Sequence, residues 1–120
     1  MLTSYKELTV WQKSIELVVE VYRITDSFPK SELYGLVSQM RRAAVSISSN
    51  IAEGYSRGHR PEYIQFIRVA FGSGAELETQ MIIAKKLELV FEDKLKKAEL
   101  LLDEVMRMLN KLVATLNPSR

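Results

Sequence analysis

The sequence contains no cysteine and a single histidine, His59, so disulfides and thiol chemistry are excluded. Four-helix proteins often hold metal ions with glutamates and Glu-x-x-His pairs, but no such pair is present. His59 also has no nearby residue that would let it activate a serine nucleophile. We therefore expect no catalytic residue, no metal site and no cofactor, and we interpret the chain as a non-enzyme. A carboxylate-only magnesium site, built from Glu53, Glu76 and Glu78, is the alternative.

Long hydrophobic runs are absent, although 47% of the 120 residues are hydrophobic. No stretch approaches the roughly 20 consecutive apolar residues that a membrane-spanning helix needs. The first residues do not combine a basic start with an apolar run, as a signal peptide would. The sequence therefore predicts a cytoplasmic protein without a membrane partner.

Helical periodicity runs through almost the whole chain, and strand patterns are nearly absent. Three groups of helix-breaking residues divide the chain into four predicted helices. These helices cover about residues 10–27, 32–53, 61–89 and 92–117. Four helices joined by short connections predict an all-α, antiparallel up-down-up-down four-helix bundle, forming one domain over residues 1–120.

Particular residues suggest where the second helix begins and ends. Ser31 is the expected N-cap of this helix, and Gly54 fits a left-handed C-terminal cap. Gly72 and Gly74 lie inside the third helix, where each costs stability relative to alanine. We expect these two glycines to allow close approach of another helix, with a kink as the alternative.

The first and last helices carry more apolar residues than one bundle seam requires. On the first helix the additional stripe consists of Trp11, Ile15, Val18, Tyr22 and Thr25. The last helix has a heptad seam and further apolar residues beside it, at Leu101, Met108 and Val113. The surplus indicates either a thicker monomer core or an interface between copies of the chain.

Polar residues interrupt the apolar pattern of the second and third helices. They are Arg42, Ser46, Asn50, Glu53, Ser73 and Glu76. One interpretation is a polar layer that crosses the bundle, with Arg42 paired to Glu76, and such a layer sets register more than it adds stability. The alternative is an ordinary solvated face.

Basic residues gather around the predicted loop between the second and third helices. They are Arg41, Arg57, Arg60 and Arg68, with tyrosines between them, and a second group consists of Lys94, Lys96 and Lys97. Arginines interleaved with aromatic rings suit phosphate contact and base stacking. The net charge is only +2, so ordinary solubilising charge is the alternative interpretation.

Two longer motifs resemble a known family. Residues 39–58 read QMRRAAVSISSNIAEGYSRG and residues 62–80 read EYIQFIRVAFGSGAELETQ. Together with Trp11 and the amphipathic run that follows it, they resemble the four-helix-bundle proteins encoded in intervening sequences of bacterial large-subunit ribosomal RNA genes. The most specific parts are Ser49–Gly54 and Ala70–Leu77. The same family includes the accessory protein of diversity-generating retroelements.

The resemblance implies a four-helix bundle that assembles into a ring-shaped homopentamer. It also implies, through the retroelement accessory protein, binding of RNA or DNA and partnership with a reverse transcriptase. Two functional hypotheses follow for this chain. One is an oligomer that binds nucleic acid through its basic loop, and the other is a structural or protein-interaction oligomer that binds no nucleic acid.

Overall fold

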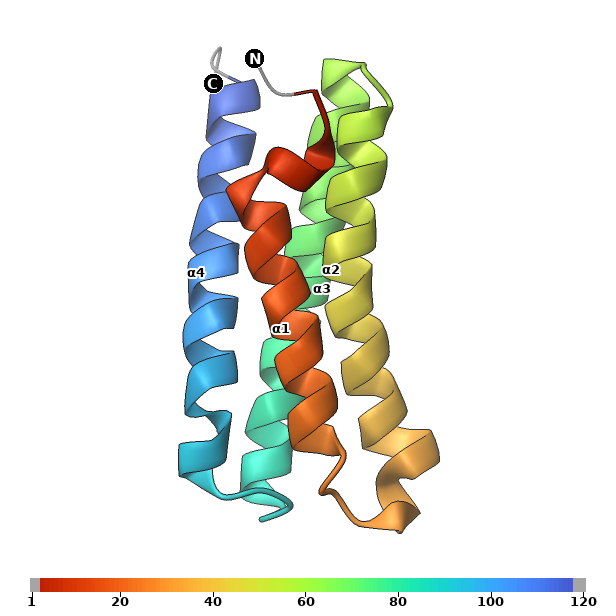
Figure 1. The fold of residues 1–120 in the computed structure, drawn as a ribbon, viewed down its shortest axis with the longest axis vertical. Helices are drawn as coiled ribbons and strands as arrows, with labels where there is room; N and C mark the ends of the chain where they lie inside the picture. Colours follow the sequence, from red (N-terminus) through yellow and green to blue (C-terminus); the bar gives the residue numbers. More distant parts are fainter. Residues whose placement is uncertain (1–2, 118–120) are drawn as a thin grey trace.

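The computed structural model of the chain describes residues 3–117, which form an antiparallel bundle of four helices (Figure 1). The helices are α1 (Thr9–Thr25), α2 (Ser38–Ser56), α3 (Arg60–Lys86) and α4 (Glu92–Leu116). A short 3-10 turn, η1 (Tyr5–Glu7), precedes α1. The start of α1 and the end of α4 lie at the same end of the bundle, as an even number of antiparallel helices requires (Figure 1). The predicted all-α four-helix bundle is confirmed.

The start of α2 differs from the prediction. The helix begins at Ser38, after a 3-10 turn, η2 (Lys30–Glu32), and one wide π-helical turn, η3 (Leu33–Val37). Ser31 lies within η2, and no side chain caps α2, so the N-cap prediction was wrong. Gly35 has non-helical backbone angles, φ −111° and ψ −110°, and this irregular residue delays the regular helix.

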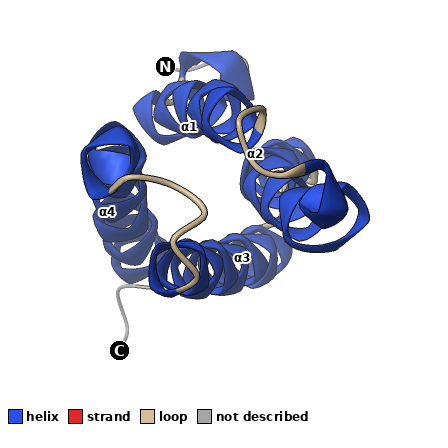
Figure 2. Cartoon of the chain, turned by 90° about the horizontal axis from the view of Figure 1, so that it is seen from below, coloured by secondary structure: helices blue, strands red, loops and turns tan. Residues whose placement is uncertain are grey.

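The core lies along the bundle axis, where each helix contributes one apolar stripe. Leu17, Ile47, Leu77 and Leu109, one from each helix, have no exposed surface. Seen along the axis, the helices occupy four corners in the order α1, α2, α3, α4 (Figure 2). The principal extents are 45 × 23 × 20 Å, and no helix of the described residues is long and apolar enough to cross a membrane.

The two helices with surplus apolar residues use them differently. Leu101 of α4 is buried, so part of the surplus on this helix thickens the monomer core. On α1, by contrast, Ile15 is 36% exposed and Tyr22 is 44% exposed. Part of the stripe on α1 therefore stays at the surface of the described chain, while Thr25 is buried and Trp11 and Val18 pack against the core.

Close helix contacts explain two of the glycines. Gly54 lies inside α2, which continues to Ser56, so the prediction of a C-terminal cap was wrong. A Cβ atom at Gly54 would lie 2.7 Å from Cβ of Phe66 on α3, too close for any side chain. A Cβ atom at Gly74 would overlap Sδ of Met106 on α4, which confirms the predicted close approach there. The same prediction was wrong for Gly72, since nothing lies within 4 Å of a Cβ atom built at that residue.

Glycine substitutions in the two helices test this packing. Gly54→Ala should lower the free energy of unfolding by about 1–3 kcal/mol, because the backbone or Phe66 must move to admit a methyl group. The matched control is Gly72→Ala, since nothing lies within 4 Å of a Cβ atom built at Gly72. This control should raise stability by ~0.5–1 kcal/mol, as alanine favours a helix over glycine. Urea denaturation followed by circular dichroism measures both, and equal effects would contradict the close contact at Gly54.

Candidate nucleic-acid interface

The predicted basic residues divide between the two ends of the bundle instead of gathering at one. Arg57 and Arg60 flank the α2–α3 loop, whereas Arg41 lies near the opposite end. There the Arg41 guanidinium stacks over the Tyr22 ring, 4.5 Å from its centroid, and Nε donates to Thr25 Oγ1 at 2.9 Å. Arg41 precedes Arg57 by sixteen residues, which corresponds to about 24 Å along a helix. The prediction of a single cluster was therefore wrong.

Arg57 is occupied by interactions within the chain. One terminal nitrogen lies 3.1 Å from Glu53 Oε2 and the other 3.5 Å from Glu62 Oε2. The guanidinium also lies 5.0 Å from the centroid of the Phe66 ring. Two carboxylates therefore neutralise this arginine, which weakens it as a phosphate contact.

Arg60 and Arg68 share a groove between the start of α3 and the end of α4. The groove has a volume of about 490 Å³ and is lined by Arg60, Pro61, Ile64, Gln65, Arg68, Leu116 and Asn117. Among residues 3–117, no carboxylate lies within 4.0 Å of either guanidinium. Arg60 is also the first residue of α3, where the helix dipole adds positive potential. We call this feature the arginine groove, and its chemistry suits an anion such as a phosphate group.

The two tyrosines beside the loop pack against each other, and Tyr63 also packs against the core. The Tyr55 and Tyr63 rings meet edge to face, with centroids 5.8 Å apart. Burial raises the pKa of the Tyr63 hydroxyl, and the neighbouring Tyr55 raises it further. A ring held in this way offers less surface for base stacking than the sequence pattern suggested.

The lysine group lies at the start of α4, at the end of the bundle opposite the α2–α3 loop (Figure 1). Lys94 and Lys96 are exposed, and no carboxylate of the described chain lies within 4.0 Å of either ammonium group. Lys97 Nζ lies 3.9 Å from Oε1 of Glu20, a buried residue of α1. These lysines therefore form a separate basic surface and do not extend the arginine groove.

Only the centre of the predicted polar layer forms. The hydroxyls of Ser46 and Ser73 are hydrogen-bonded at 2.8 Å, and Asn50 Nδ2 donates to the Ser46 carbonyl at 2.8 Å and to its hydroxyl at 3.0 Å. Arg42 and Glu76 are both exposed and line one polar groove of about 520 Å³. Within the described residues they form no ion pair, so the predicted pairing was wrong. The sixth predicted member, Glu53, contacts Arg57 instead.

The contribution of α4 to the arginine groove was not predicted. The sequence suggested only that Arg60 and Arg68 lie near the α2–α3 loop. It gave no sign that these arginines share a groove with Leu116 and Asn117. No group of three or more histidine, aspartate or glutamate residues able to hold a metal ion occurs in the described range.

Comparison with known proteins identifies the family. The sequence model of the 23S rRNA-intervening sequence proteins matches residues 6–111, so the chain belongs to this family. No curated protein matches the chain significantly. A crystal structure at 1.70 Å of a protein of unknown function, from the S23 ribosomal protein family of Bacteroides thetaiotaomicron VPI-5482, has a similar fold. It shares 19% identity with this chain at a TM-score of 0.79, and the match covers 88% of this chain and 98% of that one.

A pair of double-mutant cycles tests the polar contacts between α2 and α3. Replacing Ser46 and Ser73 by alanine, singly and together, should give a coupling energy of about 1 kcal/mol, because their hydrogen bond is partly buried. The control cycle replaces Arg42 and Glu76, whose coupling should stay below ~0.5 kcal/mol because both are exposed. Urea denaturation supplies the free energies. A larger coupling in the control cycle would restore the predicted Arg42–Glu76 pair.

Proposed function

We propose that this member of the 23S rRNA-intervening sequence protein family is a non-enzymatic homo-oligomer that binds RNA or DNA through the arginine groove. The observation that carries the proposal is the pair Arg60 and Arg68. Both line one groove, and neither has a carboxylate partner within the described chain. Unpaired arginines that face a groove are well suited to a phosphate, which the guanidinium can bind with two parallel hydrogen bonds.

The proposed mechanism is electrostatic. Two guanidinium groups and the N-terminus of α3 neutralise backbone phosphates and release their counterions. Contacts to backbone phosphates carry no sequence information, so binding that depends on these two arginines should show no strong sequence preference. In an oligomer, several copies of this weak site would act together on one nucleic acid.

The resemblance noted above adds two finer parts to the proposal, a homopentameric ring and a reverse transcriptase as protein partner.

The second candidate function is a structural or protein-interaction oligomer without nucleic-acid binding. The exposed apolar stripe on α1 favours it, because such surfaces often mark protein interfaces. Binding of nucleic acid separates the two candidates.

Charge reversal in the arginine groove tests the nucleic-acid proposal. The variant Arg60→Glu, Arg68→Glu should bind a fluorescently labelled RNA oligonucleotide of mixed sequence at least tenfold more weakly than wild type at ~50 mM salt, because it loses two phosphate contacts. The slope of log affinity against log salt should fall by about 2 for the same reason. Arg60→Glu also places an acidic residue at a helix start, which favours the helix, so the fold should be retained.

The matched control is Lys94→Glu, Lys96→Glu, which makes the same change in net charge at the other end of the bundle. It should bind as wild type does. If the lysine variant loses binding and the arginine variant does not, the site lies at the start of α4. If wild type shows no binding at ~50 mM salt, the interaction-protein candidate is correct.

Assembly is tested on the wild-type protein by light scattering coupled to size-exclusion chromatography. One chain has a mass of 13.8 kDa, and the proposal expects a single species at an integral multiple of that mass, five for the ring that the resemblance implies. The arginine variant should elute with the same mass, since its substitutions are confined to the proposed nucleic-acid site. A monomer at micromolar concentration would reject the oligomer.

A further inference from the structure

We propose that copies of this chain assemble head to tail, with the outer face of α1 and α2 on one copy packed into an acidic groove between α3 and α4 on the next. The inference rests on the homo-oligomer in the proposed function and names its two contact surfaces. We call them the apolar face and the acidic groove.

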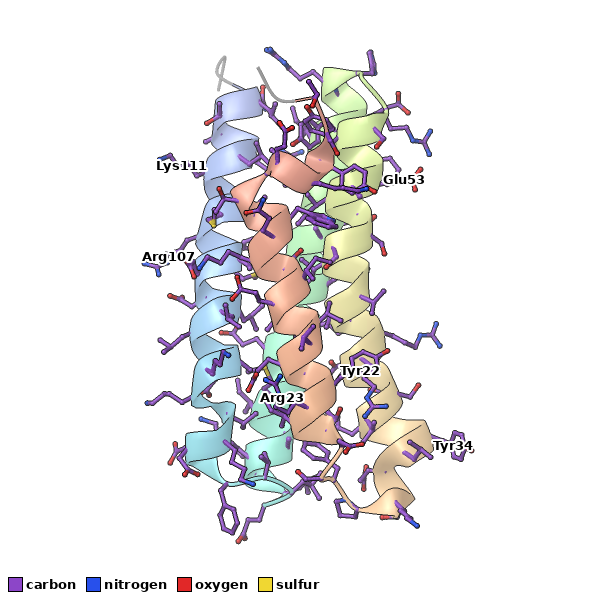
Figure 3. All side chains as sticks on the ribbon, viewed as in Figure 1. Tyr22, Arg23, Tyr34, Glu53, Arg107 and Lys111 are labelled. Atoms are coloured by element: carbon purple, nitrogen blue, oxygen red, sulfur yellow. The ribbon has the colours of Figure 1, made fainter. Side chains whose placement is uncertain are left out.

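The apolar face consists of exposed hydrophobic residues beside one arginine. These residues are Ile15, Val19 and Tyr22 of α1 and Val45 of α2, with exposed fractions of 36%, 50%, 44% and 39%. Arg41 of α2 stacks on the ring of Tyr22, and this contact joins the two helices at this surface. Figure 3 shows the Tyr22 side chain beside α2. The guanidinium keeps its terminal nitrogens available, because Nε alone bonds to Thr25 and no carboxylate of residues 3–117 is within 4.0 Å.

The acidic groove has a volume of about 400 Å³ and combines an apolar floor with carboxylates. Met81, Ile82, Leu102 and Met106 supply the floor, and Ile82 is 49% exposed. Methionine side chains adapt readily to an apolar surface pressed against them.

Three carboxylates, those of Glu78, Glu99 and Asp103, line the same groove. Glu99 binds Lys85 at 2.9 Å and Asp103 binds Arg107 at 3.0 Å. Glu78, in contrast, has no cation within 4.0 Å in the described part of the chain. The groove therefore has one carboxylate whose charge no side chain of its own copy balances.

The two surfaces lie on opposite sides of the bundle, since the α1–α2 and α3–α4 pairs occupy opposite sides of the square (Figure 2). They also lie at the same level along its axis. Ser46 of α2 contacts Ser73 of α3. Arg41 lies five residues before Ser46 and Glu78 lies five residues after Ser73, so on these antiparallel helices both are displaced by about 7.5 Å in the same direction.

This correspondence favours a second copy as the occupant of the groove. The two surfaces are complementary. Arg41 on the apolar face has no carboxylate partner, and Glu78 in the acidic groove has no cation partner. The branched side chains of the apolar face would pack against the methionines in the floor of the groove. Two different surfaces on opposite sides make the contact heterologous, which generates a ring where the rotation closes and a filament where it does not. Arg68 lies ten residues from Glu78 on α3, about 15 Å, so the arginine groove is outside this contact.

The first test compares two exposed valines. Val19→Asp places a charge within the apolar face and should convert the assembly to a monomer of 13.8 kDa in light scattering at micromolar concentration. Val69→Asp is the matched control, because Val69 is 46% exposed on α3 and belongs to neither surface. It should keep the wild-type mass. Circular dichroism establishes that both variants are folded.

The second test exchanges the proposed ion pair. Arg41→Glu and Glu78→Arg should each reduce the assembled fraction at least tenfold, and the double variant that carries both changes should recover it. Recovery requires that the two residues meet between copies, because in one chain Arg41 packs on Tyr22 of α1 whereas Glu78 lines the groove between α3 and α4.

The outcomes separate the two proposals. If wild type is a monomer, the homo-oligomer in the proposed function fails and this inference fails with it. If wild type is an oligomer and Val19→Asp keeps its mass, or if Val69→Asp dissociates as completely as Val19→Asp, the surfaces named here are wrong while the homo-oligomer stands. Loss in both single charge variants without recovery in the double variant would overturn the Arg41–Glu78 contact. Whether the Val19→Asp monomer binds RNA does not distinguish these outcomes, because the arginine groove lies outside the proposed contact between copies.

Discussion

The close contact between α2 and α3 at Gly54 is the constraint on which much of this structure depends. No side chain fits between α2 and Phe66 at that point, so the two helices approach at nearly backbone distance. The contact continues along the seam through the hydrogen bond between Ser46 and Ser73. Because α2 runs on to Ser56, the connection to α3 is short. The short connection carries Arg57 back over Phe66 and makes Arg60 the first residue of the next helix.

The positions of the carboxylates decide which arginines are available to a ligand. Arg57 lies one helical turn beyond Glu53 and close to Glu62, and both neutralise it. Arg60 and Arg68 lie on the side of α3 that meets the end of α4, where the described residues place no carboxylate within 4.0 Å. The net charge of +2 for the whole chain therefore gives no indication of the basic surface at the arginine groove. Local geometry, more than total charge, determines how the protein can meet an anion.

One seam of the bundle carries two surfaces of opposite charge. Toward one end of the α3–α4 seam lies the arginine groove, and further along it lies the groove lined by Glu78, Glu99 and Asp103. Both have apolar residues in their walls. Because the two grooves are separate, a nucleic acid bound in one would not block contact between copies through the other.

Local sequence patterns were sufficient to predict the four helices, because helical periodicity is carried by residues three and four apart. They also indicated the close packing at Gly74. The start of α2 escaped prediction because Gly35 adopts a backbone conformation that nothing in the apolar pattern requires. Three features became evident only in the folded chain: Gly54 is a packing site, Arg57 is neutralised, and Arg42 does not pair with Glu76. These outcomes depend on the distance between side chains on neighbouring elements, and that distance is set by the packing of whole helices, which no spacing along the chain encodes.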